Sequence, residues 1–345
     1  MSDESGVGAV MKSEMNEQPE VLARLAERSS ELGDVIQRVR PDPLAGVVFL
    51  GRGSSGNVGT FGRYVMEMAT GRPTSLLAPS LLTRYVRTPD YRGQLVIALS
   101  QSGMTTEIIE SCQVLRDHCG AKVIGITNNA NSDLASVVDA CVTLEAGEER
   151  AIPATKTVTA QMLAVLILAS TLGSIESIRR IDQLPQRVTD VLNDWDSPAA
   201  LVDRWLDFDR LFIASRGVAY AAALEASLKI KESASLFCQG LSTGDLRHGV
   251  VASVSTTTPV LGIAPAGPVA ADVHRLLEDL AELGVPVARC SPASDADLPL
   301  PADTGEMLQT ILAVVRAQQL ALTWSIRRGL NPDEPDLLSK VTQGT

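Results

Sequence analysis

The sequence predicts an α/β fold made of two tandem, doubly wound (flavodoxin-like) subdomains, each a parallel sheet covered by helices. Two observations predict it. Short apolar runs rich in β-branched residues alternate with helical patterns along the chain, as expected for parallel strands whose two faces are both covered. This pattern then restarts in the second half of the chain at a constant offset. A chain of 345 residues that is 45% apolar can bury the cores of two such subdomains.

The elements of the first half follow a polar, helix-prone lead-in over residues 11–40. Apolar runs predict five strands, which we place at 47–50, 74–78, 95–99, 122–127 and 141–144. Helical patterns follow the first strand up to about residue 70 and the third strand up to residue 118. Residues 155–172 form a further helical pattern that is apolar nearly all round, which predicts a buried helix.

The second half repeats the first with an offset of 164 residues. The strand and turn at 49–53 return at 213–217, and the strands that contain Val96 and Val123 return around Val260 and Val287. Three matches at one offset indicate two copies of a single α/β unit. We therefore expect four parts, namely a helical lead-in over 1–42, subdomains over 43–192 and 193–330, and a tail over 331–345.

A polar turn follows the third predicted strand and precedes a helix. It carries hydroxyl and amide side chains at Ser100, Gln101, Ser102 and Thr105. A helix N-terminus presents unpaired backbone N–H groups and the positive end of the helix dipole, so this turn is suited to an anion such as phosphate. The alternative is a turn that only caps its helix. The equivalent turn of the second copy, 264–268, has no hydroxyl, so the fold itself does not require one.

The turn after the first strand, Gly51-Arg52-Gly53-Ser54-Ser55-Gly56, matches the G-x-G-x-x-G pattern of dinucleotide-binding folds. Such folds also carry an acidic residue at the end of the second strand, which binds the ribose. Here that strand ends in Pro79-Ser80, so we expect no nicotinamide or flavin cofactor. The hydroxyls of Ser54 and Ser55 instead indicate a second polar wall for the site at the 100–105 turn, because ligands of doubly wound sheets bind at the carboxyl ends of neighbouring strands.

Three ionisable residues share one face of a helix predicted in the second half. Glu225, Lys229 and Glu232 are spaced i, i+4 and i+7. On an exposed helix they would form a solvated stripe of salt bridges. Because the flanking residues are apolar, we expect a largely buried helix on which a glutamate beside a lysine can transfer protons.

Of the three histidines, His248 is the candidate acid–base residue. It lies in a glycine-bounded stretch, 244–249, that predicts a loop rather than a periodic element. Loop histidines titrate near neutral pH and often serve as acids or bases. His118 and His274 lie in amphipathic helical patterns and are expected to be structural or solvated.

Composition argues against several classes of protein. The net charge of −11 disfavours nucleic acid as a partner. No apolar run reaches the roughly 18 residues that a membrane span needs, and residues 1–10 lack the basic segment of a secretory signal. The five cysteines are scattered without metal-ligand spacing, which predicts no metal site and a reducing, cytoplasmic location.

In combination these motifs resemble the sugar isomerase (SIS) family, and more narrowly the isomerase half of glucosamine-6-phosphate synthase and its free-standing relatives. The resemblance covers nearly the whole chain. The motifs that carry it are Met11-x-x-Glu14-x-x-Glu17-Gln18-Pro19, Ser100-Gln101-Ser102-Gly103-x-Thr105, Ala154-Thr155-Lys156-Thr157, Leu224-Glu225-x-x-Leu228-Lys229-x-Lys231-Glu232, Leu246-Arg247-His248-Gly249 and, at the end of the chain, Asp333-Glu334-Pro335 followed by Ser339-Lys340-Val341-Thr342.

The resemblance implies a role for each motif. Glu232 moves a proton between C1 and C2 of a sugar phosphate with the aid of Lys229, His248 opens the sugar ring, and Lys340 on the tail closes over the substrate. The phosphate and sugar are expected to bind at Gly53, Ser54, Ser55, Ser100, Gln101, Ser102, Thr105 and Ala154. The resemblance also implies a homodimer with shared active sites, in which the histidine comes from the neighbouring chain, and no cofactor.

Three positions depart from the family pattern. Met104 replaces a glutamate, Ala154 after Pro153 replaces a small hydroxyl residue, and Val250 replaces a proline. Nothing in the sequence resembles a glutaminase domain, which needs an N-terminal cysteine, so we expect no ammonia from glutamine. The expected reaction is therefore the deamination of glucosamine 6-phosphate with water to fructose 6-phosphate and ammonia. The alternatives are a galactosamine-6-phosphate deaminase, a fructosamine-6-phosphate deglycase and a non-catalytic sugar-phosphate-binding regulator.

Overall fold

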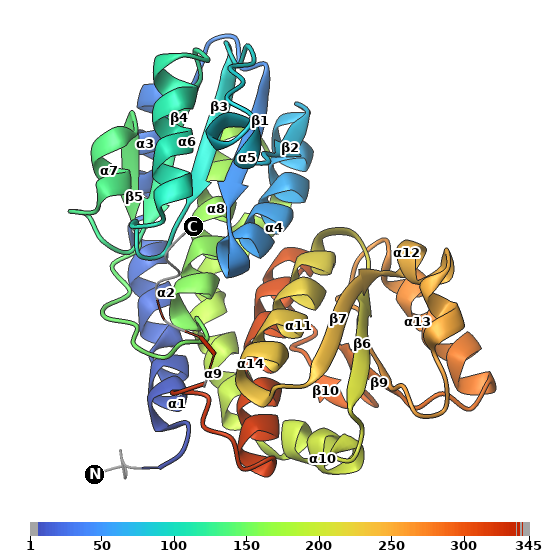
Figure 1. The fold of residues 1–345 in the computed structure, drawn as a ribbon. Coiled ribbons are helices and arrows are strands. Elements are labelled where there is room, and N and C mark those ends of the chain that lie inside the picture. Colours follow the sequence, from blue (N-terminus) through green and yellow to red (C-terminus); the bar gives the residue numbers. More distant parts are fainter. Residues whose placement is uncertain (1–5, 336, 339, 341–345) are drawn as a thin grey trace. The chain divides into compact units, whose positions relative to one another are not determined.

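The structure, a computed structural model, describes residues 6–335, 337, 338 and 340. It contains two parallel five-stranded sheets, each in a compact unit of its own (Figure 1). The β1–β5 unit comprises residues 20–149 and 156–179. The β6–β10 unit comprises the described residues of 6–19, 150–155 and 180–340.

The first sheet has the strand order β2-β1-β3-β4-β5, with every neighbouring pair parallel. Its strands are β1 (Gly46–Gly51), β2 (Thr74–Leu76), β3 (Gln94–Leu99), β4 (Lys122–Thr127) and β5 (Ala140–Thr143). This 2-1-3-4-5 order is that of flavodoxin-like folds, so the predicted fold class is confirmed. The predicted strand at 74–78 is shorter in the structure and ends at Leu76.

Helices cover both faces of this sheet (Figure 1). One face is packed by α4 (Gly53–Thr70), α8 (Lys156–Leu172) and α3 (Ser29–Val39), and the other by α5 (Ser80–Thr83), α6 (Thr106–Asp117) and α7 (Asp133–Val137). The predicted lead-in consists of α3 together with two shorter helices, α1 (Ala9–Asn16) and α2 (Gln18–Glu27). As predicted, α8 is buried along most of its length.

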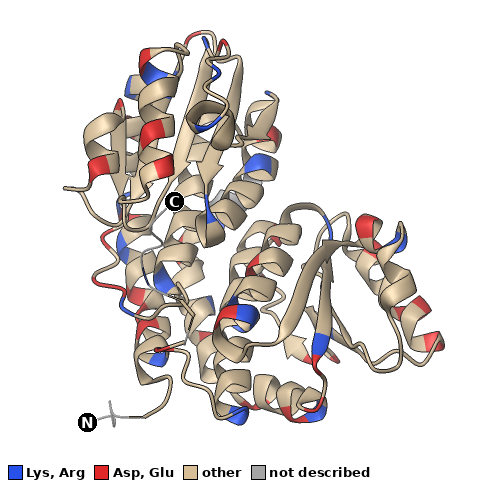
Figure 2. Ribbon diagram, in the orientation of Figure 1, with Lys and Arg blue, Asp and Glu red and all other residues tan. Residues whose placement is uncertain are grey.

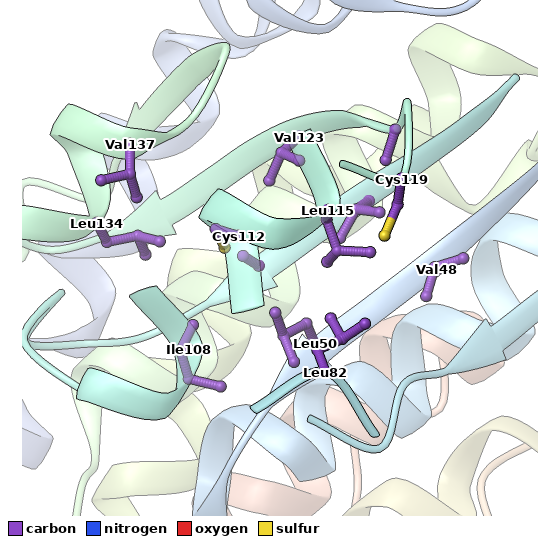
Figure 3. Packing of buried hydrophobic residues seen from close by; sticks show 13 residues of the cluster. Val48, Leu50, Leu82, Ile108, Cys112, Leu115, Cys119, Val123, Leu134 and Val137 are labelled. Atoms are coloured by element: carbon purple, nitrogen blue, oxygen red, sulfur yellow. The ribbon is translucent and has the colours of Figure 1, made fainter. Parts of the chain in front are cut away.

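Alternation along β1 divides its side chains between these two layers. Val48 and Leu50 point into an apolar cluster that β1, β3 and β4 form with α5, α6 and α7 (Figure 3). Phe49 points the other way, towards α4, where a Cβ atom on Gly62 would lie 2.3 Å from its ring. The absence of a side chain at Gly62 therefore lets α4 approach the sheet closely.

The second sheet has the order β10-β9-β8-β6-β7, also parallel throughout. Its strands are β6 (Arg210–Ser215), β7 (Phe237–Ser242), β8 (Val260–Ile263), β9 (Val287–Ser291) and β10 (Leu298–Pro299). The other elements of this unit are α9 (Leu184–Asn193), α10 (Asp196–Trp205), α11 (Tyr220–Ala234), α12 (Thr243–Arg247), α13 (Ala270–Glu282), α14 (Glu306–Arg327), η2 (Gly217–Ala219) and η3 (Val250–Ser253), and η1 (Glu176–Gln183) precedes α9. Helices α11 and α14 pack on each other, and α13 belongs to a separate core cluster with β6 and β8.

The pairing of the strands repeats with the same offset that the sequence shows. Val48 pairs with Val96, which pairs with Val123. In the second sheet Phe212 pairs with Val260, which pairs with Val287, and each of these lies 164 positions after its counterpart. The repeat is therefore one of structure and not only of sequence pattern.

Charged residues lie mainly on helices and loops, and most strands carry none (Figure 2). This distribution fits sheets that are covered on both faces. Among the residues that the structure describes, no helix combines the length and the apolar character needed to cross a bilayer.

Candidate active site

The 100–105 turn connects β3 to α6, as the sequence predicts. Ser100 is buried, and its hydroxyl lies 3.2 Å from that of Thr105 and accepts a hydrogen bond from the backbone N–H of Gly103. Ser102 accepts one from the backbone N–H of Met104 in the same way. The hydroxyls thus hold the turn compactly at the N-terminus of α6, where anions are favoured. Met104 itself is exposed, and nothing in the structure explains the methionine at this position.

Gly103 fixes the path of this turn for two reasons. Its φ of +65° is left-handed, a conformation that costs residues with a side chain free energy. A Cβ atom here would also lie 2.2 Å from the hydroxyl oxygen of Ser132 and 2.8 Å from that of Thr127. No side chain fits at this position unless the turn moves.

We expect Gly103→Ala to displace the turn and to weaken the binding of a phosphorylated ligand by about tenfold or more, with a loss of about 1–3 kcal/mol in unfolding free energy. Gly71→Ala is the matched control, because Gly71 has a φ of +62° but open space around it. The control should lose stability and keep its affinity in calorimetry with a sugar phosphate. Equal affinity losses in both variants would contradict a binding role for the turn.

The turn between β1 and α4 adjoins the 100–105 turn within the same unit. Gly51 at the end of β1 pairs with Leu99 at the end of β3. Arg52 then forms an ion pair of 2.7 Å with Glu107 in the first turn of α6. Gly53, with a φ of +54°, begins α4.

Ser55 on α4 has a buried partner that the sequence analysis did not single out. Its hydroxyl donates to Oε1 of Gln161 on α8 over 3.1 Å. Gln161 is only 1% exposed, and its Nε2 has no hydrogen-bond partner among the described residues. The amide therefore fixes the orientation of a hydroxyl that we expect to contact the ligand.

The α11 cluster forms as predicted in the β6–β10 unit. The Lys229 ammonium lies 2.5 Å from Oε2 of Glu232 and 3.6 Å from Oε1 of Glu225. The side chains of Lys229 and Glu225 are 1% and 2% exposed, whereas that of Glu232 is 22% exposed. A buried ammonium needs carboxylate partners, and of these two glutamates Glu232 is the one that a ligand can reach.

Glu232 also lines a cavity of about 500 Å³. The remaining wall consists of residues from the end of α11 and from the chain after α14, namely Lys231, Ser233, Ser235, Leu330, Asn331, Glu334, Pro335, Leu337 and Leu338. A carboxylate that is held by an ammonium at one oxygen and faces a cavity has the arrangement of a general base.

His248 lies elsewhere in this unit, and the loop predicted around it needs correction. Residues Thr243–Arg247 form the short helix α12, because the Ser242 hydroxyl caps the backbone N–H of Asp245 over 3.1 Å. His248 follows directly as the C-cap residue and is exposed. Within the described residues, no hydrogen bond or ion pair joins its imidazole to Glu232.

Lys340 and Ala154 also belong to the β6–β10 unit. The Lys340 ammonium donates a hydrogen bond of 2.6 Å to the carbonyl of Ala151. Ala154 is half-buried three residues further along the same segment. The neighbours of Lys340 in its motif, Ser339, Val341 and Thr342, lie outside the described residues.

The predicted site residues thus divide between the two units. Gly53, Ser54, Ser55 and the 100–105 turn belong to the β1–β5 unit, whereas Ala154, Lys229, Glu232, His248 and Lys340 belong to the β6–β10 unit. No cluster of three or more His, Cys, Asp or Glu side chains suited to a metal ion occurs in the described part of the chain.

In the second copy of the polar turn, residues 264–268, side chains of the protein itself occupy the space next to the backbone. A Cβ atom on Gly267 would lie 2.5 Å from the carboxyl carbon of Glu306, and Gln309 accepts a hydrogen bond of 2.6 Å from the backbone N–H of Ala266. Burial raises the pKa of Glu306 above its usual value. The two copies have therefore diverged at this turn, as the sequence predicts.

These features define a two-sheet α/β protein with a hydroxyl-lined turn in one unit and a buried acid–base cluster in the other. The SIS domain model matches residues 46–171 and 207–291, and the chain belongs to the SIS domain family.

Curated relatives cover nearly the whole chain. It is 27% identical over 348 residues to glutamine–fructose-6-phosphate aminotransferase [isomerizing] of Methanothermobacter thermautotrophicus, which covers 99% of this chain and 58% of the relative. The enzyme of the same name from Gloeobacter violaceus is 31% identical over 366 residues, covering 98% of this chain and 59% of the relative. The chain therefore spans somewhat more than half the length of these relatives.

Solved structures agree with the fold. Glucosamine-6-phosphate deaminase of Thermotoga maritima matches with a TM-score of 0.80 at 25% identity, over 97% of this chain and 99% of that one. The C-terminal domain of glucosamine-fructose-6-phosphate aminotransferase from Francisella tularensis matches with a TM-score of 0.85 at 21% identity, over 97% and 100%. The second match shows the likeness of the fold alone.

Proposed function

We propose that this protein is an isomerising deaminase of an amino-sugar phosphate, and that it converts glucosamine 6-phosphate and water to fructose 6-phosphate and ammonia. The observation that carries the proposal is the α11 cluster, in which the buried ammonium of Lys229 holds the cavity-facing carboxylate of Glu232. The similarity to a glucosamine-6-phosphate deaminase over nearly the whole chain supports it.

Substrate binding is assigned to the polar turns of the β1–β5 unit. The hydroxyls of Ser55, Ser100, Ser102 and Thr105 and the amide of Gln101 bind the phosphate, together with the N-terminus of α6. Gly53 and Ser54 complete the turn between β1 and α4, the helix that also carries Ser55. Ala154 contacts the sugar. Binding energy from the phosphate end then orients carbons C1 and C2 for reaction.

Proton transfer is assigned to Glu232. His248 assists ring opening, which exposes the C1 aldehyde and makes the C2 proton acidic. The Glu232 carboxylate removes that proton while the C1 oxygen takes one from solvent, which gives an enolamine with a double bond between C1 and C2. Glu232 then delivers its proton to C1 while the amine nitrogen gives one up to solvent. This leaves an imine at C2, which water hydrolyses to the ketone with release of ammonia. Lys229 keeps the carboxylate of Glu232 in place, and Lys340 binds the substrate from the tail.

The proposal includes a homodimer in which His248 serves the site of the neighbouring chain. The exposure of His248 and the absence of any bond to Glu232 among the described residues support this assignment. It also includes a cytoplasmic location, which is supported by five free cysteines. Burial raises the pKa of Cys112, Cys238 and Cys290 to about 12, so these thiols resist oxidation.

An assay of ammonia release over a panel of sugar phosphates tests the proposal. We expect release from glucosamine 6-phosphate with fructose 6-phosphate formed in equal amount. Release from galactosamine 6-phosphate alone, or formation of glucose 6-phosphate from a fructosamine 6-phosphate adduct, would show that this other compound is the substrate in place of glucosamine 6-phosphate. Tight binding in calorimetry without turnover of any compound would show a sugar-phosphate-binding regulator and overturn the proposal.

A further inference from the structure

Helix α1 begins without a cap of its own. Its N-cap residue is Gly8, which has no side chain to accept hydrogen bonds from the first turn. The chain after α14 supplies the acceptors instead. The two carboxylate oxygens of Asp333 accept from the backbone N–H groups of Val10 and Met11 over 3.0 and 2.9 Å, and Oδ1 of Asn331 accepts from that of Gly8 over 3.2 Å.

The other end of α1 holds the segment that binds Lys340. Glu14 is 3% exposed, and its carboxylate accepts hydrogen bonds from the backbone N–H groups of Arg150 and Ala151. The carbonyl of the same Ala151 accepts the hydrogen bond from the Lys340 ammonium, at 2.6 Å. Glu14 and Lys340 are therefore joined through a single residue.

These contacts attach the tail to both ends of α1 inside the β6–β10 unit. The tail is bound to the start of α1 through Asp333, and it returns to the end of α1 through Lys340, Ala151 and Glu14. Between these two attachments lie the tail residues Glu334, Pro335, Leu337 and Leu338, which line the cavity of Glu232. The sequence separation is large, since Asp333 and Met11 are 322 positions apart.

We propose that Glu14 and Asp333 are positioning residues, which hold Lys340 and the cavity wall in place by fastening the tail to α1 at two points. Neither residue is assigned contact with the substrate. Glu14 acts through the backbone of Ala151, and Asp333 acts through the N-terminus of α1. The proposal rests on the proposed function for the role of Lys340 in turnover, but the contacts themselves do not depend on it.

The chemistry of Glu14 suggests a conservative substitution. Its carboxylate offers only acceptors to two backbone N–H groups, whereas the amide of Gln offers one acceptor and a donor that faces an N–H group. Glu14→Gln should therefore release the 150–151 segment while keeping the volume of the buried side chain. Glu27→Gln, at an exposed glutamate on α2, is the matched control.

Two measurements on the full-length chain test the proposal. In the first, Lys340 is labelled with an amine-reactive reagent and followed by mass spectrometry. We expect labelling of Lys340 to be several-fold faster in Glu14→Gln and in Asp333→Ala than in the wild type, and unchanged in Glu27→Gln. Unchanged labelling in folded Glu14→Gln would overturn the inference whatever the activity of the protein.

The second measurement is a double-mutant cycle on kcat/KM for glucosamine 6-phosphate. We expect Glu14→Gln to lower kcat/KM about tenfold in the wild-type background and less than about twofold in the Lys340→Ala background. Equal losses in both backgrounds would mean that Glu14 acts on the fold and not through Lys340, and would overturn the inference. If Lys340→Ala retains full activity, the assigned role of Lys340 fails, and the labelling result alone decides whether the two fastening points exist.

Discussion

Glu232→Gln is expected to lower the turnover of glucosamine 6-phosphate by about 10²- to 10⁴-fold while leaving sugar-phosphate binding largely intact. The Gln amide keeps the shape of the side chain, and its oxygen still accepts the hydrogen bond that Lys229 now donates over 2.5 Å. It has no basic group to take the C2 proton. Steady-state kinetics and calorimetry separate the two effects, because kcat should fall and the dissociation constant should not.

Glu225→Gln is the matched variant for this prediction. It makes the same change on the other side of the same ammonium, but Glu225 is 2% exposed and does not line the cavity. We expect Glu225→Gln to lower stability and to reduce kcat by less than about tenfold. A kcat for Glu232→Gln near the wild-type value, or equal losses in the two variants, would contradict the role given to Glu232.

Arg316→Met is expected to destabilise the protein by about 3–5 kcal/mol, because it breaks a buried network and leaves its partners unsatisfied. The Arg316 guanidinium on α14 is 3% exposed. It bonds to the carboxylate of Asp194 over 2.8 Å and also to the carbonyls of Val191, Asp194 and Pro299. These bonds join α14 to the end of α9 and to β10.

Urea unfolding measures this effect, and Arg327→Met on the same helix is its control. Arg327 pairs with Asp203 over 2.7 Å, but the two side chains are 45% and 53% exposed, so solvent screens the pair. The control should lose less than about 1 kcal/mol. A loss of that size for Arg316→Met as well would contradict the account of this network.

The free energy of unfolding at acidic pH gives a second test of the role of Arg316. Burial by itself raises the pKa of Asp194, but hydrogen bonds from Ser197 and the charge and hydrogen bond of Arg316 outweigh it, so the pKa is lowered overall. A carboxyl group whose folded pKa is depressed adds stability above its unfolded pKa of about 3.9, and this contribution is lost as the pH falls through the folded pKa. The difference in stability between the wild type and Arg316→Met should therefore narrow below about pH 4, and a constant difference from pH 7 to pH 3 would contradict this.

The sheets could be predicted from sequence because their strands are short, apolar and buried on both faces. The constant offset between Val96 and Val260 was enough to show the repeat, and the structure has the same offset in the pairing of these strands. Strand β7 was missed. It is the edge strand next to β6, and its alternating exposed positions include Phe237 and Gln239, so it lacks the continuous apolar pattern of a central strand.

The local geometry of the candidate site was also predictable, whereas its long-range contacts were not. The spacing of Glu225, Lys229 and Glu232 on one helix places them on one face, and the structure confirms this contact. The partners of Ser55 and Lys340 lie 106 and 189 positions away along the chain. Such contacts depend on tertiary packing, which no local periodicity reveals.

The central claim is that Glu232 carries a proton from C2 to C1, and glucosamine 6-phosphate labelled with deuterium at C2 tests it most directly. With the wild-type protein, the account predicts that deuterium leaves C2 and appears at C1 of fructose 6-phosphate, in step with ammonia release. With Glu232→Gln, the label should stay at C2 in substrate that still binds. Ammonia release with deuterium retained at C2, or loss of the label in Glu232→Gln at the wild-type rate, would contradict the account.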